Sequence, residues 1–142
     1  RHRYIKRFLD TPLTEIRALG WALYRYRALV GSFLHWGYNY WYLSQTRELI
    51  DPYTETDGGR WPGWAYGDPF VVYPGLEGPV DSIRLEAFAE GLSDYRLLEA
   101  SGVEPDAGLL AAIRGFDDFP REPGWYASAR GEVLADRGAA QR

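Results

Sequence analysis

The sequence predicts an α/β fold in which helices predominate, and three features of the 142 residues indicate it. Apolar residues recur at helical spacing in two long segments, 12–29 and 82–100. A short apolar run, 32–36, follows the first segment after a glycine and is typical of a buried strand. A helix, a brief turn and a buried strand form half of a βαβ unit, which builds parallel sheets and barrels.

The first predicted helix spans 12–29. Thr11 can cap it, and Pro12 suits the first helical position. Gly31 ends it. Its apolar stripe, at spacings of three and four, consists of Ile16, Leu19, Leu23, Tyr26 and Val30.

The predicted strand 32–36 cannot form a sheet alone, because its backbone groups would be left unpaired. We therefore expect its partner strands to lie upstream of Arg1, so that residues 1–142 form a single incomplete domain. The absence of methionine from the chain favours the same view.

Residues 37–80 are predicted to form a long loop rich in glycine, proline and aromatic side chains. Loops of this length in compact domains are usually functional or disordered. Aromatic residues make up 16% of the chain, and their density in this segment favours an ordered loop. Residues 70–73 could form a short strand within it.

Three further helices are expected after this loop. The first, 82–100, can be capped by Asp81 or Ser82 and ends at Ser101-Gly102. Its predicted buried side consists of Leu85, Phe88, Leu92, Tyr95 and Leu98. Two C-terminal helices follow within 105–136, one over 105–114 and one from 123, the latter with Tyr126, Ala129 and Val133 facing inward.

Composition argues against several classes of function. The net charge is −4 and there is no basic stripe, so we expect no nucleic-acid partner. With no cysteine and two histidines, neither a disulfide framework nor a metal site is expected, and no cofactor is indicated. No apolar run reaches membrane-spanning length, so no membrane partner is expected. A cytosolic and a secreted bacterial protein fit equally well.

The residues after the predicted strand are the strongest candidates for binding a ligand. In a β/α barrel the active site lies at the carboxyl ends of the strands. Trp36 could form a flat platform for a sugar ring, and Asn39 offers both a donor and an acceptor to hydroxyl groups. Tyr40 and Trp41 could join them, although packing beneath the loop explains these aromatics as well. His35 would face away from Trp36 and is better explained as a core residue.

Asp68 and Tyr73, in the long loop, complete the candidate substrate-binding set. Asp68 could bind a sugar hydroxyl or cap its own turn. Arg84 and Glu86 are expected to form an ion pair that anchors the loop. Asp94, Asp117 and Asp118 are expected to be solvated or capping residues. No carboxylate pair suited to glycoside hydrolysis stands out, so no catalytic residue is assigned.

Three segments together resemble the C-terminal part of the catalytic domain of glycoside hydrolase family 123. The first is Arg7–Leu13 with Arg17 and Gly20-Trp21, and the second is Gly31–Trp41. The third comprises Gly67-Asp68-Pro69, Tyr73-Pro74-Gly75, Gly78-Pro79, Ser82–Glu86, Gly91, Asp94 and Tyr95. The sequence departs from the family at Ala89-Glu90, where Arg-Asp is common, and at Pro69, where glycine is common.

The resemblance implies a (β/α)₈ TIM barrel. This chain would supply its seventh helix, eighth strand, long aromatic loop and eighth helix, with extra C-terminal helices. Characterised relatives are exo-acting β-N-acetylgalactosaminidases in which the substrate's acetamido oxygen attacks the anomeric carbon. Their Asp-Glu pair lies earlier in the barrel, so the implied partners here are a carbohydrate substrate and the remainder of the barrel.

Two other functions fit the sequence. One is a non-catalytic module, derived from a barrel enzyme, that binds glycans or proteins through the aromatic loop. The other is a small independent α-rich domain with a structural role. The sequence upstream of Arg1 would distinguish the binding module from an enzyme, because loss of the Asp-Glu pair would favour binding only. The independent α-rich domain instead predicts cooperative unfolding of the isolated 142 residues.

Overall fold

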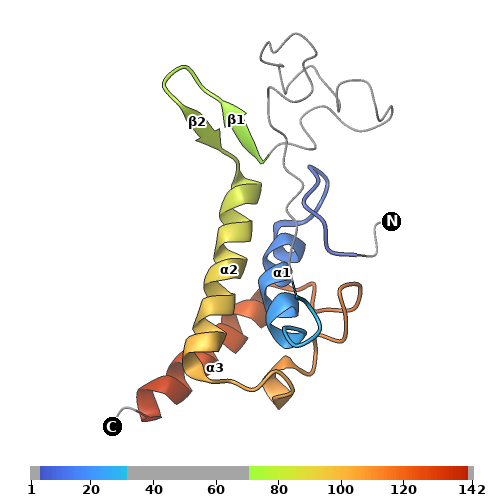
Figure 1. Cartoon of the computed structure of the whole chain (residues 1–142), viewed down its shortest axis with the longest axis vertical. Coiled ribbons are helices and arrows are strands. Elements are labelled where there is room, and N and C mark those ends of the chain that lie inside the picture. The colour runs from blue at the N-terminus through green and yellow to red at the C-terminus, as the bar shows by residue number, and fades with distance from the viewer. Residues whose placement is uncertain (1–3, 32–70, 141–142) are drawn as a thin grey trace. The chain divides into compact units, whose positions relative to one another are not determined.

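The computed structural model describes residues 4–31 and 71–140 (Figure 1). The described residues are mostly helical, with three α-helices, one 3₁₀ turn and one two-stranded sheet. These are α1 (Leu13–Arg25), β1 (Val72–Pro74), β2 (Pro79–Asp81), α2 (Ile83–Ser101), η2 (Gly108–Leu110) and α3 (Pro123–Ala140). The predicted strand 32–36 and most of the predicted loop 37–80 lie outside the described residues.

The chain divides into two compact units, and the boundary between them falls within α2, after Glu86. Unit 1 contains residues 1–6, 12–33 and 87–142, and unit 2 contains residues 7–11 and 34–86. Each unit is described by itself below.

Helix α1 begins at Leu13, after Pro12, and no side chain caps its first turn. The expected role of Thr11 as the cap is wrong. The Thr11 hydroxyl accepts a hydrogen bond from the backbone N–H of Phe8 at 3.2 Å, so it closes the preceding turn instead. The helix ends at Arg25, and residues 26–29, expected to be helical, form turns.

Residues 71–82 form a β-hairpin, whereas the sequence suggested one strand within a long loop. β1 pairs antiparallel with β2, and Tyr73 lies opposite Val80. Gly75 and Gly78 close the turn through a 2.9 Å backbone hydrogen bond, and Gly78 has a φ of 146° that other residues rarely adopt. The three-residue strands are too short for an alternating pattern to reveal them.

Helix α2 follows the hairpin directly (Figure 1). Ser82 caps it, as one of the two predicted alternatives, because the Leu85 N–H donates to the Ser82 hydroxyl at 3.3 Å. At the other end Gly102 adopts a φ of 69°, the left-handed conformation typical of a helix stop.

The buried stripe of α2 differs from the predicted one. It consists of Arg84, Ala87, Gly91, Asp94 and Leu98, at spacings of three and four. Of the five predicted residues only Leu98 is buried, and Leu92 is 38% exposed. The apolar pattern was misleading because two residues of this stripe are not apolar side chains: Gly91 makes a close contact with α1, and Asp94 is a buried carboxylate.

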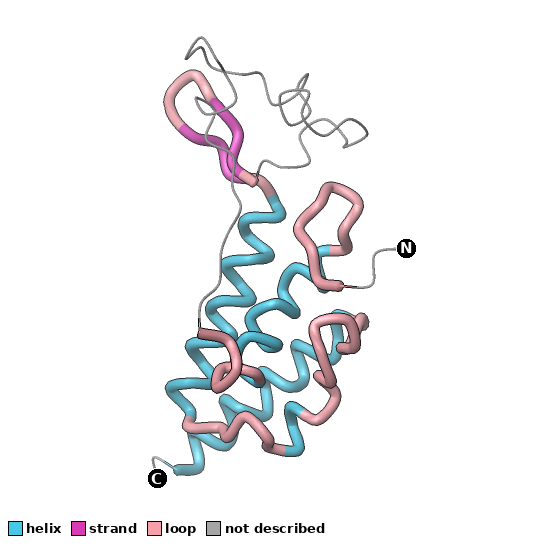
Figure 2. Tube along the Cα trace, turned by 45° about the vertical axis from the view of Figure 1, so that its right-hand side comes forward, coloured by secondary structure: helices cyan, strands magenta, loops and turns pink. Residues whose placement is uncertain are grey.

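The core of unit 1 lies between α1, α2 and α3, which pack against one another in Figures 1 and 2. Trp21, Tyr24, Leu98, Tyr126 and Val133 are at most 1% exposed. The stripe predicted for α1 omitted Trp21 and Tyr24, which are its largest fully buried side chains. A β-carbon at Gly20 would lie 1.8 Å from the Gly91 carbonyl oxygen, so α1 and α2 touch through their backbones.

The C-terminal segment contains one α-helix where two were expected. Within 105–114, the structure has only the 3₁₀ turn η2, flanked by turns. Successive backbone bonds join residues three apart, such as Leu110 N–H to the Ala107 carbonyl, because Pro105 and Gly108 disfavour a regular helix. α3 begins at Pro123, and Tyr126, Ala129 and Val133 are buried as predicted.

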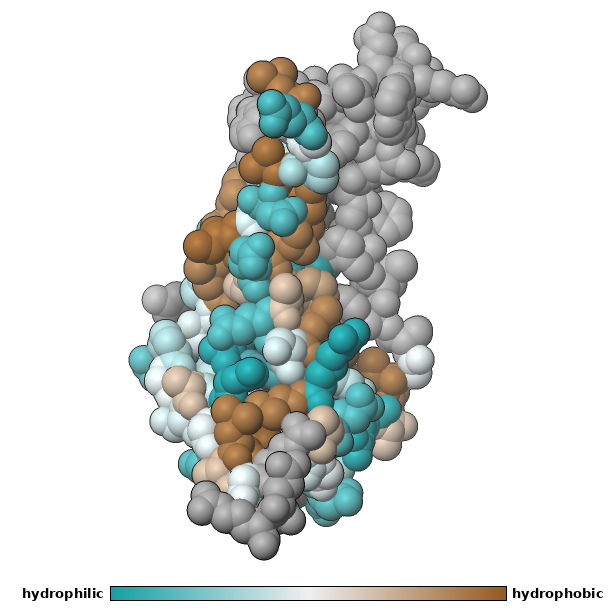
Figure 3. Space-filling view, turned by 90° about the vertical axis from the view of Figure 1, so that its left-hand side faces the viewer, coloured by the Kyte–Doolittle hydropathy of each residue, from teal (hydrophilic) through white to brown (hydrophobic). Residues whose placement is uncertain are grey.

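On the face drawn in Figure 3, hydrophobic side chains are interleaved with hydrophilic ones. Among the described residues, none of the helices combines the length and apolar character that crossing a membrane requires.

Candidate functional site

Five of the six predicted substrate-binding residues, Trp36, Asn39, Tyr40, Trp41 and Asp68, lie outside the described residues. Their role therefore stays a prediction. The sixth, Tyr73, is described, and the structure shows how its side chain is held.

Tyr73 and Arg84 form the centre of a polar cluster in unit 2. Tyr73 is half-buried in β1, and Arg84, in the first turn of α2, is only 3% exposed. The Arg84 Nη2 group donates to the Tyr73 hydroxyl at 2.8 Å, and its Nη1 group donates to the Arg7 carbonyl at 2.7 Å. One guanidinium therefore joins the hairpin to the segment that precedes α1.

The backbone around Tyr73 is fixed at several points. The Ser82 N–H and hydroxyl both donate to the Val71 carbonyl, at 3.2 and 2.6 Å. Ser82 is also the cap of α2, so the start of β1 and the start of α2 are joined through one residue. The pair of Tyr73 and Val80 lies between these hydrogen bonds and the turn of the hairpin. The hairpin backbone therefore sets the direction in which the Tyr73 side chain leaves the strand.

Two arginines of this cluster, Arg7 and Arg84, influence each other electrostatically. Burial, together with the neighbouring Arg84, lowers the pKa of Arg7 from its ordinary value. The contacts described for Arg84 go to Tyr73 and Arg7, while Glu86 on the same helical turn is exposed. The described contacts of Arg84 thus anchor the hairpin through a phenol and a carbonyl, and the ion pair with Glu86 expected from the sequence is not among them.

A second cluster, centred on Asp94, lies in the core of unit 1. Asp94 is 0% exposed, so the expectation that it is solvated or caps a turn is wrong. Its carboxylate accepts hydrogen bonds from Arg17 Nε at 2.7 Å, from Trp21 Nε1 at 2.8 Å and from Arg130 Nη1. Three helices are thereby joined at one carboxylate.

The Asp94 cluster has the character of a structural site. All the described donors converge on the carboxylate from α1 and α3, and the Arg17 side chain is only 15% exposed. Arg17 also pairs with Glu90 at 2.8 Å. The sequence contained one usable signal: Arg17 and Trp21 are four residues apart and therefore share a face of α1.

Two buried tyrosine hydroxyls of unit 1 form hydrogen bonds with backbone carbonyls. Tyr126 donates to the Pro120 carbonyl at 2.7 Å, and the Tyr24 hydroxyl lies within reach of the Val103 and Leu98 carbonyls, at 2.5 and 3.2 Å. Burial raises the pKa of both Tyr126 and Tyr24, although nearby arginines oppose the shift. These phenols therefore stay neutral well above neutral pH.

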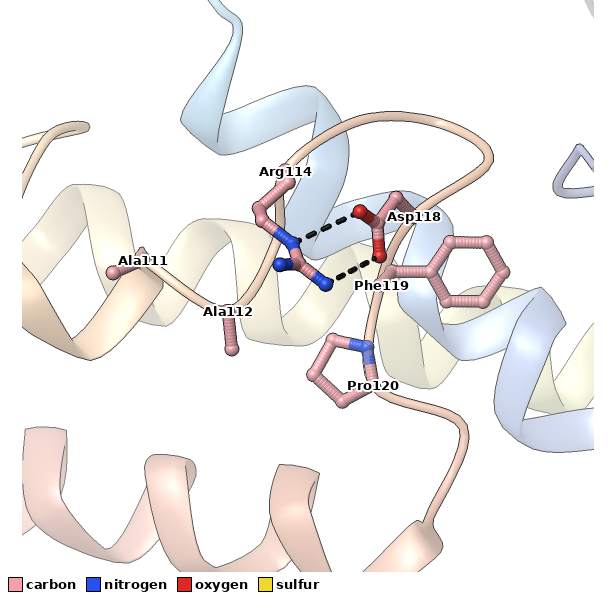
Figure 4. Close-up of a pocket in the computed structure, with 6 residues that line it drawn as sticks. All are labelled: Ala111, Ala112, Arg114, Asp118, Phe119 and Pro120. Carbon is pink, nitrogen blue, oxygen red and sulfur yellow. Dashed lines mark hydrogen bonds and ion pairs between the residues drawn. The ribbon is translucent and has the colours of Figure 1, made fainter.

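A hollow of about 400 Å³ is lined by residues of the loop between η2 and α3. Figure 4 shows these residues. The main polar feature of the hollow is the pair of Arg114 and Asp118, joined by contacts of 2.9 and 3.0 Å. Both side chains are at least 50% exposed, so water weakens the pair, and the hollow contains none of the predicted site residues. Within residues 4–31 and 71–140, no group of three or more His, Asp or Glu side chains is placed to hold a metal ion.

Residues 1–101 match the family described as Glycoside hydrolase 123, catalytic domain. The matched range includes α1, the hairpin, Tyr73, Arg84 and Asp94, and it ends at the last residue of α2. η2 and α3 lie beyond it. No curated protein matches the chain.

Proposed function

Because the chain belongs to the glycoside hydrolase 123 family, by its catalytic-domain match over residues 1–101, we propose that it forms part of an enzyme that cleaves N-acetylhexosaminides. The proposed reaction is that of a retaining β-N-acetylgalactosaminidase in which the substrate's own acetamido group is the nucleophile. The family match is the single observation that carries this proposal.

In the proposed arrangement the chain contributes one wall of a sugar-binding cleft in a (β/α)₈ barrel. α1 is the seventh helix of that barrel, residues 32–36 are its eighth strand, and α2 is its eighth helix. Trp36, Asn39, Tyr40, Trp41 and Asp68 line the wall together with Tyr73. The strand pairing and the hydrogen bond from Arg84 support this role for Tyr73, because a side chain already held in place loses less conformational freedom when a sugar binds.

The catalytic acids are proposed to come from another part of the protein. Substrate-assisted hydrolysis needs an acid in addition to the acetamido group. The 142 residues contain no aspartate followed directly by a glutamate. Two described carboxylates are instead bound to arginines: Asp94 to Arg17 and Arg130, and Glu15 to Arg121.

The proposal is tested by assaying the full-length protein against a panel of aryl glycosides. The panel should contain β-N-acetylgalactosaminide, β-N-acetylglucosaminide and the β-galactoside and β-glucoside that lack the acetamido group. We expect turnover of an N-acetylhexosaminide only. Binding of the sugars without turnover would favour a glycan-binding module. If the protein neither binds nor hydrolyses these sugars, the proposal is overturned.

A further inference from the structure

We infer that the folded catalytic domain of this protein continues past the residues that match the family and includes residues 102–140, called the C-terminal segment below. The family match ends at residue 101, where α2 also ends. The surface concerned lies on α1 and α2, and its partner is a later part of the same chain. Which sugar the enzyme cleaves has no bearing on this arrangement.

The end of α1 supplies hydrogen-bond donors to the irregular part of the C-terminal segment. Arg25 Nη1 donates to the Pro105 carbonyl at 3.3 Å, and the Tyr26 hydroxyl donates to the Ile113 carbonyl at 3.3 Å. The Tyr24 hydroxyl adds its contact with the carbonyl of the second residue of the segment. Backbone carbonyls outside regular helices and sheets need donors from elsewhere in the protein or from water. Three successive residues at the end of α1 therefore hold the backbone that leads from α2 to α3.

The first turn and the middle of α1 contact the C-terminal segment as well. Arg121 binds the carboxylate of Glu15, which lies in the first turn and is 9% exposed. In the middle of the helix, the ring of Trp21 meets the rings of Trp125 and Tyr126 edge-on. The segment therefore contacts α1 at its start, its middle and its end.

Helix α2 is joined to the C-terminal segment through the buried carboxylate of Asp94. Arg17 and Trp21 bind this carboxylate from within the matched range, and Arg130 binds it from α3. Without the segment, a carboxylate that is 0% exposed would lose one of the two arginines described at it. Loss of a charged partner from a buried carboxylate is strongly unfavourable.

The apolar core of unit 1 also draws on both sides of residue 101. Trp21 and Tyr24, in the matched range, are 0% exposed and share one core cluster with side chains of the C-terminal segment. Aromatic side chains that lost this cover would form an exposed apolar patch, which soluble domains seldom leave open. The buried core residues that the segment supplies are Leu110, Ile113, Phe119, Tyr126, Ala129 and Val133.

The test is hydrogen exchange, measured by mass spectrometry on the full-length protein. Buried helical amides exchange through rare openings, so helices that open together are protected to a similar degree. We expect α3 to be protected as strongly as α1 and α2. Arg130→Met removes the charge at Asp94 and should accelerate exchange about tenfold in all three helices, the low end for a hydrogen bond to a charged group, because Arg130 is 35% exposed. Rapid exchange of α3 beside protected α1 and α2, or acceleration in α3 alone, would overturn the inference.

The matched control is Arg114→Met, which alters an arginine of the same segment whose pair with Asp118 is exposed. It should accelerate exchange less than about threefold. Equal acceleration by the two variants would show that the Asp94 contact does not join the helices, and it would overturn the inference.

A second variant deletes residues 102–140 from the full-length protein. It should lose both the protection of α1 and α2 and the turnover of N-acetylhexosaminides, a readout that rests on the proposed function. Unchanged turnover after the deletion would overturn the inference while leaving the proposed function intact. If the unaltered protein hydrolyses none of these sugars, the proposed function is overturned, and hydrogen exchange alone decides the inference.

Discussion

Trp21 and Asp94, 73 residues apart in the chain, are joined by a buried hydrogen bond of 2.8 Å from the indole nitrogen to the carboxylate. The same carboxylate binds Arg17 on α1 and Arg130 on α3. Asp94 is therefore the point at which all three helices of unit 1 meet. Because a buried carboxylate requires compensating charge and hydrogen bonds, its partners must all be in place for the core to form.

Asp94→Asn should destabilise the protein strongly, because it leaves the Arg17 guanidinium near a neutral group in a largely buried setting. We expect a loss of about 3 kcal/mol in the free energy of unfolding, the low end of the range for a broken buried pair, since Arg130 is 35% exposed. Urea unfolding measures this loss. The matched control is Asp118→Asn, whose pair with Arg114 is exposed and should contribute less than about 1 kcal/mol. Similar losses from both variants would contradict the structural role of Asp94.

The contact between α1 and α2 depends on glycine at two positions. A β-carbon at Gly20 would lie 1.8 Å from the Gly91 carbonyl oxygen, and one at Gly91 would lie 2.5 Å from the Arg17 carbonyl oxygen. Gly20→Ala should therefore cost about 3 kcal/mol or more, because the backbones must separate. Gly131→Ala in α3, where no atom lies within 4 Å of the added carbon, should instead stabilise the protein by about 0.5–1 kcal/mol. Thermal unfolding of the two variants distinguishes them, and a shift of the same sign in both would be inconsistent with the close contact.

α3 lies beyond the residues that match the family, yet it belongs to the same core. Trp125 and Tyr126 pack edge-on against Trp21, with ring centres 5.4 and 5.9 Å away. Val133→Ala should cost about 2 kcal/mol because it removes buried methyl groups. The neighbouring Leu134 is 49% exposed, and Leu134→Ala should cost less than about 1 kcal/mol. Equal effects in urea unfolding would show that α3 is not packed as described.

Alkaline pH should weaken the core through Tyr126. Burial raises the pKa of this phenol above its ordinary value, so the folded protein holds the proton more tightly than the unfolded chain does. The contribution of the protonated Tyr126 to the free energy of unfolding is complete below about pH 10 and is lost progressively above it. Tyr126→Phe should lower the free energy of unfolding by about 1 kcal/mol at pH 7, because it removes the hydrogen bond to Pro120. Above pH 10 the difference between the variant and the unaltered protein should shrink, because only the unaltered protein has this phenol to ionise. A deficit that stays constant from pH 7 to 11 would contradict this account.

The sequence predicted those parts of the structure that depend on local signals. The helix expected over 82–100 corresponds to α2, and Ser82 and Gly102 mark its two ends. The hairpin was recognised only in part, because strands of three residues carry little pattern. Its register depends on the Gly75–Gly78 turn and on the tie between Val71 and Ser82, and neither is visible as periodicity.

The buried polar contacts could not be predicted in this way. Asp94 was expected at the surface because carboxylates are rarely buried without partners, and its partners are on helices distant in sequence. The same holds for Arg84, whose contacts with Tyr73 and the Arg7 carbonyl bridge separations of 11 and 77 residues. Of the predicted sugar-binding residues, Tyr73 alone lies in the described part of the chain, and its place in a sugar-binding wall stays a prediction.

The central claim, that this protein acts on N-acetylhexosaminides with help from the substrate's acetamido group, is tested most directly by NMR of the hydrolysis reaction. The full-length protein would be mixed with an aryl β-N-acetylgalactosaminide and, separately, with the aryl β-galactoside that lacks the acetamido group. The account predicts that only the first is hydrolysed and that the β-anomer of the free sugar appears before the α-anomer. Hydrolysis of both substrates at similar rates, or initial appearance of the α-anomer, would contradict it.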